Sequence, residues 1–350
     1  MKLSKLLNGP RTTGIGSLPH HNTDSAMEFA FGVEIPFLPE IPIRNPYEYM
    51  IPRALEGLPG LSVDRDGLAI LDPEMWDRLS PAFDRRMASA FASGSSRDAF
   101  AAFEPSAAAS SCWQPFLWEL AERGCRIAKI QLAGPLTSQW VLRLKEGGPA
   151  ADTAVGAQIV RLVLARAVAM VRRLRDLQVE PIFFLDEPGL FGLNRENPRH
   201  VMAIQELKLL VLSLKKEGVI VGLHCCSDTD WGTVLALGLD VLSIDVELSL
   251  GALLGVPSSR TFVERGGVFS FGVIPNTWTG ERLRAARAED CLAPILDRFA
   301  EHWPDARELG SRAVMTGLYT PACGLAMHST TDAEAVLALL ADARQWLVAR

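Results

Sequence analysis

Three side chains that could bind a metal ion occur late in the chain: His224 and Cys226 in the segment GLHCCS, and Cys323 in the segment TPACGL. Imidazole and thiolate together favour zinc, which accepts nitrogen and sulfur ligands in a tetrahedral arrangement. On an extended segment alternate side chains share a face, so His224 and Cys226 can point into one site while Cys225 faces the opposite way. An H-x-C pair alone is more often a core cysteine beside a hydrogen-bonded histidine, so a metal site requires support from other residues.

Two short apolar runs flank this pair, GVIVGL and DVLSI. Each is rich in aliphatic and β-branched residues and is too short for a core helix, which predicts two buried parallel strands. The segment between them, DTDWGTVLALG, predicts a helix that is capped by Asp228 or Thr229.

The same alternation continues along the chain. Apolar runs predict eight strands, at residues 13–18, 34–39, 126–132, 181–186, 219–224, 240–245, 267–273 and 313–319. Helical patterns separate most of them, at residues 23–32, 113–124, 135–146, 151–177, 198–217, 228–238, 281–301 and 331–348. Strands that alternate with helices require parallel crossovers. The sequence therefore predicts an α/β fold, a single (β/α)8 TIM barrel in which residues 1–350 form one domain.

One stretch interrupts this pattern, at about residues 41–112. It begins with the proline-rich segment IPIRNPYEYMIPRALEGLPG, continues with the hairpin-like segment SVDRDGLAILDPEM, and ends in a helix and a tract rich in glycine, serine and alanine. The stretch is too long for an ordinary loop between a strand and a helix. We expect an insertion after the second strand, partly helical, that could cover the mouth of the barrel.

Composition excludes several classes of partner. The formal net charge is −6 and the isoelectric point is near 5.6, and Lys and Arg are dispersed, so neither nucleic acid nor an anionic membrane is an expected partner. No apolar run is long enough for a signal peptide or a membrane span, which predicts a cytoplasmic protein. Six cysteines in 350 residues, none in a small-domain spacing, indicate reduced thiols. Cys112, Cys125 and Cys291 are expected to be small buried residues.

Barrel enzymes carry their chemistry at the carboxyl ends of the strands. The reactive residues of this sequence gather at those positions. They are Ser17, Glu40, Asp186, Glu187, His224, Cys226, Asp245 and Cys323. Polar residues also collect in ordinary loops, so Asp186–Glu187–Pro188 could cap a following segment, and Glu40 could pair with Arg44 or Arg53.

The segments TTGIGSLPH, FLDEPGL, HCC, LSID and TPACGL resemble the catalytic domain of cobalamin-independent methionine synthase, within the superfamily that includes uroporphyrinogen decarboxylase. The resemblance implies a zinc ion bound by His224, Cys226, Asp245 and Cys323. The family usually has glutamate where Asp245 stands, and Glu247 is the expected substitute.

The resemblance also assigns binding of the amino acid part of a thiol substrate. Ile15 and Ser17 correspond to its backbone donors, and Glu40 and Asp186 to its acids. We assign catalytic roles to Asp186 and His20, since His20 follows Ser17 at the expected mouth of the barrel and could contact the substrate or a zinc ligand.

A zinc-dependent methyltransferase that activates a thiol is the predicted function, with homocysteine converted to methionine. A free thiol has a pKa near 8.5, and a bound cation deprotonates it without a separate base. The methyl donor is expected to be methyltetrahydrofolate or a methylcorrinoid, free or on a corrinoid protein. Methionine synthases of this type carry a second barrel that helps to bind folate, and 350 residues leave no room for it. The family's acid histidine also has no match here, since Gly272 stands near its place. Both differences favour a corrinoid, whose departure needs no proton.

Other interpretations stay open. A corrinoid-linked methyltransferase could act on another thiol, and a uroporphyrinogen decarboxylase-like enzyme would use arginines such as Arg11, Arg44 and Arg53. A zinc-binding regulatory barrel without turnover is a different class. Trp231 and Trp278 could line a pocket for a flat ligand or fill core space. His328, close after Cys323, could face the site or lie on the surface.

Overall fold

A computed structural model describes residues 9–94, 98–150 and 154–349, together with Leu3, Leu7 and Ser96. Ala151, where the sequence predicts a helix to begin, lies outside the described residues, as do the ends of the predicted domain, Met1 and Arg350.

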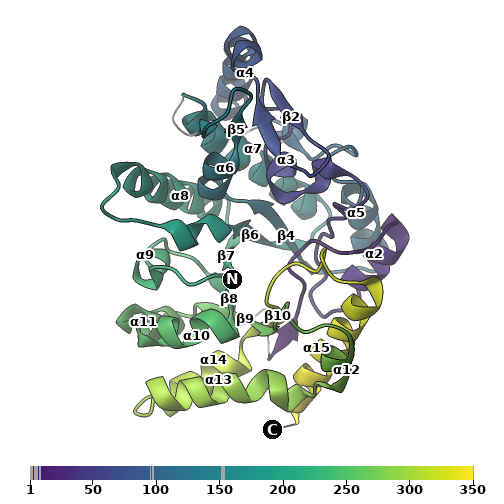
Figure 1. Cartoon of the computed structure of the whole chain (residues 1–350), viewed down its shortest axis with the longest axis vertical. Coiled ribbons are helices and arrows are strands. Elements are labelled where there is room, and N and C mark those ends of the chain that lie inside the picture. The colour runs from purple at the N-terminus through teal and green to yellow at the C-terminus, as the bar shows by residue number, and fades with distance from the viewer. Residues whose placement is uncertain are drawn as a thin grey trace.

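The centre of the molecule is a curled sheet of seven strands in the order β1-β10-β9-β8-β7-β6-β4 (Figure 1). Every neighbouring pair in this sheet is parallel. The strands are β1 (Arg11–Thr12), β4 (Ile127–Ala133), β6 (Glu180–Asp186), β7 (Ile220–Cys225), β8 (Val241–Asp245), β9 (Val268–Ile274) and β10 (Leu318–Pro321). The chain is therefore an α/β protein with a parallel sheet, as the alternating pattern predicts.

Helices surround the outer face of this sheet (Figure 1). They are α2 (Thr23–Ala30), α5 (Trp113–Glu122), α6 (Pro135–Val141), α7 (Val155–Asp176), α8 (Pro198–Lys216), α9 (Trp231–Leu235), α10 (Val246–Gly255), α11 (Pro257–Glu264), α12 (Gly280–Ala285), α13 (Ala288–His302), α14 (Arg307–Met315) and α15 (Thr330–Val348). Asp230 caps α9, two residues after the first expected cap, Asp228. None of the helices in the described segments combines the length and the apolar composition needed to cross a membrane.

The predicted second strand, residues 34–39, is not one of the seven strands. The backbone here still forms hydrogen bonds with the segments on either side of it. Leu38 N–H donates to Lys129 O of β4 at 2.9 Å, and Glu40 N–H donates to Gly16 O, after β1, at 3.0 Å. Single parallel bridges join Phe37 to Lys129 and Ser17 to Glu40. Pro36 and Pro39 have no N–H group, which explains why a continuous ladder does not form.

Two predicted strands are shifted and three helices were not predicted. The first strand is Arg11–Thr12 and not 13–18, and residues 313–315 belong to α14, with β10 starting at Leu318. Short apolar runs do not distinguish the end of a helix from a strand, and this ambiguity explains the second error. Helices α10, α11 and α14 lie where no helix was expected.

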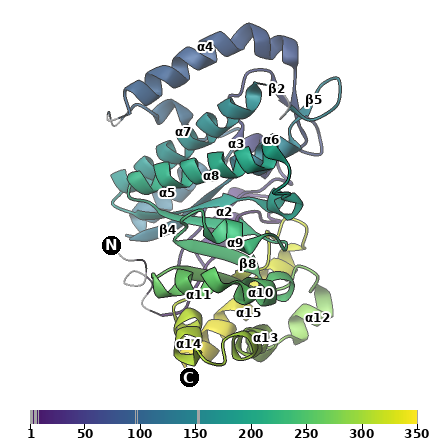
Figure 2. The same ribbon diagram turned by 90° about the vertical axis from the view of Figure 1, so that its left-hand side faces the viewer.

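The stretch 41–112, the expected insertion, is partly helical. It contains the 3-10 helix η1 (Pro46–Glu48), α3 (Met50–Ala54), the antiparallel pair β2 (Leu61–Val63) and β3 (Ala69–Leu71), α4 (Pro73–Ala92) and the 3-10 helix η2 (Ala101–Phe103). Strand β3 also pairs with β5 (Arg143–Leu144), so the insertion is joined to the segment after α6. Helix α4 lies at one extreme of the molecule, whereas α3 packs on β4 (Figure 2).

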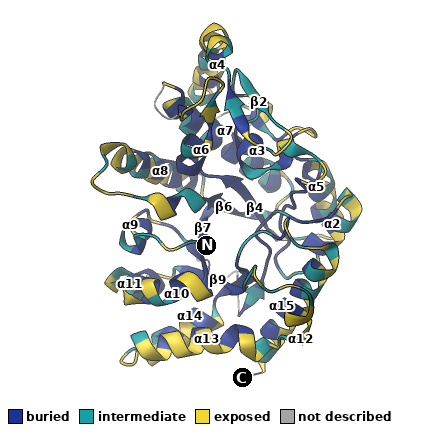
Figure 3. Ribbon diagram, in the orientation of Figure 1, coloured by how far each residue is buried: buried dark blue, intermediate teal, exposed yellow. Residues whose placement is uncertain are grey.

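The inner side of the curled sheet changes from apolar to polar along the strands. At the amino-terminal ends of the strands it holds an apolar cluster, formed by Leu3, Leu7, Ile35, Ile182, Phe184, Ile220, Val241, Val268 and Leu318. Two or four residues further along the same strands, in the same alternating positions, stand Asp186, His224, Ser243, Asp245 and Ser270. All are buried, and buried residues dominate the sheet in Figure 3. The polar residues therefore meet at the carboxyl ends of the strands, where barrel enzymes hold their sites.

Candidate functional site

Strand register brings the polar residues side by side. Asp186 of β6 is opposite His224 of β7, and His224 is opposite Ser243 of β8. One step further, Asp245 of β8 is opposite Gly272 of β9. Parallel strands place these positions at one level of the sheet.

His224, Cys226 and Cys323 form a compact group that could hold a metal ion. One ligand atom from each residue lies within 4.8 Å of the other two. His224 is at the end of β7, Cys226 directly follows that strand, and Cys323 follows β10. Residues almost 100 positions apart thus meet because β7 and β10 end on the same edge of the sheet.

The imidazole of His224 is oriented by a neighbouring strand. Its Nδ1 lies 3.0 Å from Ser243 Oγ, and its Nε2 is buried without a hydrogen-bond partner. A hydrogen bond at one ring nitrogen that orients the other is the usual arrangement of a metal-binding histidine.

The two cysteines differ in their surroundings. A hydrogen bond from the Cys323 thiol, together with the neighbouring imidazole of His224, lowers the pKa of Cys226 to about 4. The same hydrogen bond to Cys226, together with burial, raises the pKa of Cys323. The Cys323 thiol and the His224 imidazole therefore stabilise Cys226 as a thiolate even without an ion, and this is the form in which cysteine binds metals.

Asn276, which the sequence analysis did not select, holds the loop that carries Cys323. Its Oδ1 accepts from the N–H of Cys323 at 3.1 Å, and its Nδ2 donates to the carbonyl of Gly324 at 2.9 Å. The side chain of Ser17 packs against this loop, so closely that a Cβ at Gly324 would collide with Ser17 Oγ. Ser17 O also accepts from Leu325 N–H at 2.7 Å.

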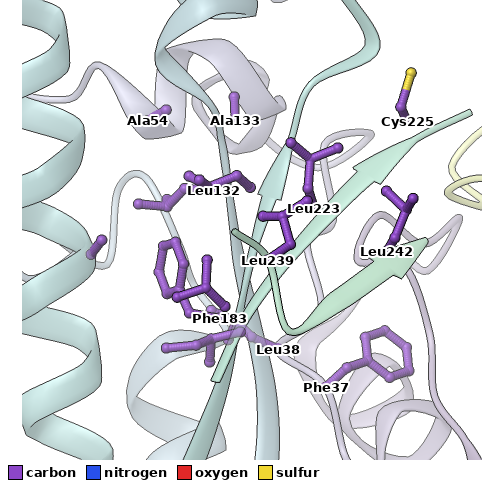
Figure 4. Packing of buried hydrophobic residues seen from close by; sticks show 14 of the residues in the cluster. Phe37, Leu38, Ala54, Leu132, Ala133, Phe183, Leu223, Cys225, Leu239 and Leu242 are labelled. Atoms are coloured by element: carbon purple, nitrogen blue, oxygen red, sulfur yellow. The ribbon is translucent and has the colours of Figure 1, made fainter. Parts of the chain in front are cut away.

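Cys225 faces away from this group, as the strand alternation predicts. It belongs to a second apolar cluster, between the sheet and the surrounding helices, which includes Leu223 and Leu242 and is called the outer cluster below (Figure 4). Its thiol donates to Ser227 O at 3.3 Å, and burial raises its pKa to about 12. Cys112 and Cys291 are buried and Cys125 is half-buried in the same outer cluster.

Asp245 lies near the group but has another partner. Its Oδ1 accepts from Leu248 N–H at 3.1 Å and so caps α10, and burial raises its pKa. Within the described part of the chain, the group of close ligand atoms does not include Asp245. Glu247, the expected substitute, does not share a strand face with Asp245, because β8 ends at Asp245 and Glu247 is exposed in the first turn of α10.

Asp186 is the acid whose environment is most unusual. Burial raises its pKa to about 7, against the positive charges of Lys129 and His224. Its Oδ1 is buried and has no hydrogen-bond partner. A buried carboxyl whose pKa is near neutrality is typical of functional sites.

Glu40 lies in the same buried group, already paired. Its Oε1 accepts from Gln131 Nε2 at 2.8 Å and from Nη1 of Arg53, one of the two arginines with which the sequence suggests a pairing. Lys129 donates to Ile15 O at 2.6 Å and to Gln131 Oε1 at 3.2 Å. Burial lowers the pKa of Lys129 to about 8. The carbonyl of Ile15 is thus held by a buried ammonium group.

Glu187 has a structural role. Its carboxylate accepts from Leu136 N–H at 3.0 Å and from Thr137 N–H at 2.7 Å, so it caps the start of α6. Thr137 Oγ1 donates to the same carboxylate at 2.6 Å. The sequence suggests a cap on the following segment, but the capped helix lies some 50 residues earlier in the chain.

His20, which the sequence analysis places at the mouth of the barrel, is buried. Its ring packs on Phe29 of α2 with centroids 5.3 Å apart, and burial lowers its pKa, against the attraction of Glu334. His328 is half-buried in the loop after Cys323. These contacts place His20 on the side of α2 and α15.

The remaining candidates lie elsewhere. Arg11 donates to Leu7 O, and Arg44 donates to Thr23 Oγ1. Trp231 is buried in the outer cluster, and Trp278 is half-buried with Arg282 over its ring.

Lys129, Gln131, Ser243 and Asn276 are site residues that sequence reasoning missed. For two of them a signal existed, since Lys129 and Gln131 alternate on a strand that is otherwise apolar. Asn276 follows its strand in an irregular loop, where no periodicity identifies it.

Solved structures include proteins of similar fold. No protein-family model matches the sequence, and no curated protein matches it. The fold is similar to that of a methyltransferase from Methanosarcina mazei, with a TM-score of 0.45 and 11% identity. The match covers 70% of this chain and 66% of the other, so the chain spans just under two thirds of that protein. A likeness of this degree decides neither family nor reaction.

Proposed function

We propose that this protein is a zinc-dependent methyltransferase that activates a thiol, with homocysteine as substrate and methionine as product. The observation that carries the proposal is the group formed by His224, Cys226 and Cys323, whose ligand atoms lie within 4.8 Å of one another. We further propose that the seven-stranded sheet is part of a (β/α)8 barrel, closed by residues 34–40 between β1 and β4.

The residues present fit zinc. One imidazole nitrogen and two sulfurs are a common set of three protein ligands, and His224 Nε2 is a buried nitrogen that lacks a partner. A fourth position would be available to Asp245 or to the substrate sulfur. When bound, zinc would supply the Lewis acidity that makes a thiol into a thiolate near neutral pH.

The chain itself would bind and orient the amino acid part of the substrate. Asp186 provides an unpaired buried carboxyl oxygen for the ammonium group. Lys129 and Asn276 hold the segments of Ile15 and Cys323, so both sides of the site are positioned before substrate binds. In the reaction the substrate sulfur attacks the methyl carbon. The new S–C bond forms as the bond to the donor breaks, and the electron pair of that bond stays with the donor.

Two methyl donors fit this scheme, methyltetrahydrofolate and a methylcorrinoid, the latter free or on a corrinoid protein. Gly272 has no side chain that could protonate a leaving group, and it lies opposite Asp245 near the site. This arrangement favours a corrinoid, because its departure needs no proton.

Metal analysis and methyl transfer test the proposal together. We expect the purified protein to contain close to one zinc per chain and to methylate homocysteine from one of the two donors. Cys226→Ser and Cys323→Ser are expected to lose both zinc and transfer. Cys225→Ser is the matched control and should retain both, because that thiol lies in the outer cluster. Zinc without transfer from either donor would instead indicate a regulatory barrel, and absence of zinc would contradict the proposal.

A further inference from the structure

A groove on the outside of the protein has no role in the proposed reaction. It has a volume of about 670 Å³ and lies among α13, α14 and α15, the helices at the lower end of the molecule in Figure 1. Helix α13 packs against both other helices and contributes the ring of Phe299. This ring contacts Phe271 of β9 edge-on, with centroids 6.2 Å apart. Because Phe271 belongs to the outer cluster, the groove lies on the side of the sheet opposite to the histidine–cysteine group.

Small residues keep the groove open. Ala300 of α13, together with Gly310 and Ser311 of α14, lines it. A Cβ at Gly310 would lie 3.1 Å from the ring of Phe299, so this glycine lets α14 approach the ring closely. Large apolar side chains at these positions would fill the space between the helices.

Most of the groove is apolar, and part of this surface is exposed. Leu296 is 37% exposed and Met315 is 36% exposed, whereas Val314 and Leu347 are buried members of the outer cluster. The apolar interior therefore reaches the solvent here. Exposed apolar surface in a groove of this volume is typical of a binding site.

A positive charge without a partner also faces the groove. Among the described residues that line it, Arg307 is the single charged one, and its side chain has no hydrogen bond or ion pair with any of the residues that the structure describes. Ser311 follows one turn later on the same face of α14, and its hydroxyl also has no partner within the described segments. The N–H of Trp346 is already donated to Glu289 Oε1 at 3.4 Å. A ligand in the groove would thus find one guanidinium and one hydroxyl.

The polarity of the groove changes along α14. Arg307 and Ser311 come first, and Val314 and Met315 stand in the last turn, about 12 Å from Arg307 at the usual rise per residue. A guanidinium binds a carboxylate through two parallel hydrogen bonds, and an alkyl chain would bury its apolar surface against the other residues. A two-fold contact centred on this groove would instead bring two Arg307 side chains together without an acid in the lining.

We propose that this groove binds an aliphatic carboxylate, a free fatty acid of medium chain length. Its carboxylate would bind Arg307 and Ser311, and its chain would lie along Val314, Met315 and Phe299. The inference is independent of the proposed function, because the groove and the histidine–cysteine group lie on opposite sides of the sheet.

Calorimetric titration of the intact protein with octanoate tests this inference. We expect one octanoate to bind per chain. 1-Octanol has the same chain without the charge and should bind about 10-fold more weakly, as expected for a lost charged hydrogen bond. Butanoate lacks four methylene groups and should bind at least about 10-fold more weakly, because each buried methylene contributes to binding. Octylamine, with the opposite charge, should bind more weakly than 1-octanol.

Substitutions assign the two parts of the ligand. Arg307→Met should weaken octanoate about 10-fold and leave 1-octanol unchanged. Ala300→Phe fills the groove and should weaken both ligands. Arg65→Met is the matched control, because Arg65 is an exposed arginine between β2 and β3. Thermal denaturation establishes that the variants are folded, and zinc content and methyl transfer should be unchanged in Arg307→Met.

Several outcomes would overturn the inference. One is a folded Arg307→Met variant that binds octanoate as tightly as the wild type. Others are equal affinities for octanoate and octylamine, or no saturable binding of octanoate at all. A wild-type dimer that Ala300→Phe dissociates in sedimentation velocity would assign the groove to a second copy of the chain. If Ala300→Phe does not fold, equal binding of octanoate and butanoate by the wild type would reject the apolar contact.

Discussion

Replacing Gly272 by alanine should displace Cys323 from the group that it forms with His224 and Cys226. A Cβ at Gly272 would lie 2.7 Å from Ala322 Cα and 2.7 Å from Ile244 O, whereas ordinary contacts begin at 3.4 Å. Both atoms belong to the backbone, so no side chain can rotate away. The strand end must move by about 0.7 Å, and Ala322 directly precedes Cys323.

This shift exceeds the tolerance of a metal site. Ligand distances in such sites vary by about 0.2 Å, and disturbing the residues that support a ligand typically weakens metal binding about 10- to 100-fold. Overpacking a strand contact costs about 1–3 kcal/mol of folding stability. We therefore expect Gly272→Ala to lose about 10- to 100-fold in zinc affinity and to unfold at lower urea concentration.

Competition with a chromophoric chelator measures the zinc affinity, and urea denaturation measures stability. Gly255→Ala is the matched control, because a Cβ there meets nothing within 4 Å. Residue 255 is at the end of helix α10, so the control should keep zinc and be as stable as the wild type or slightly more so. Wild-type zinc affinity in Gly272→Ala would refute the claim that this contact positions Cys323.

Three further substitutions probe the supports of the site. Asn276→Ala removes both hydrogen bonds that hold the Cys323 loop, and a chelator titration should show about 10-fold weaker zinc binding with little change in unfolding. Thr137→Val removes the hydroxyl that donates to Glu187 and accepts from Gly189 N–H. Urea denaturation should show a loss of about 1–3 kcal/mol in the free energy of unfolding, and Thr137→Ser, which keeps the hydroxyl, should largely avoid this loss. Burial lowers the pKa of Lys129 to about 8 from 10.5, so the folded chain releases this proton at lower pH than the unfolded chain does. Between pH 8 and 10.5 the wild type should therefore gain stability relative to Lys129→Met, on the order of 3 kcal/mol, and a flat difference would contradict the burial argument.

Local patterns in the sequence were sufficient to predict much of this protein. The period-two alternation of β7 places His224 and Cys225 on opposite faces. Alternating strands and helices predict a parallel sheet, and a parallel sheet collects its carboxyl ends on one edge. That reasoning is enough to expect Cys323 near His224, and the structure brings them together. What the group binds stays a prediction.

Tertiary structure alone decided how the charged residues are paired. Asp186 and Glu187 are adjacent in sequence, yet one faces the inside of the sheet with a free oxygen and the other caps α6. Glu247 lies in the first turn of α10 and not on the strand with Asp245, because this helix starts directly after β8. Arg53 reaches the site only because α3 packs on β4. Each outcome depends on contacts between segments distant in the chain, and short-range periodicity carries no information about such contacts.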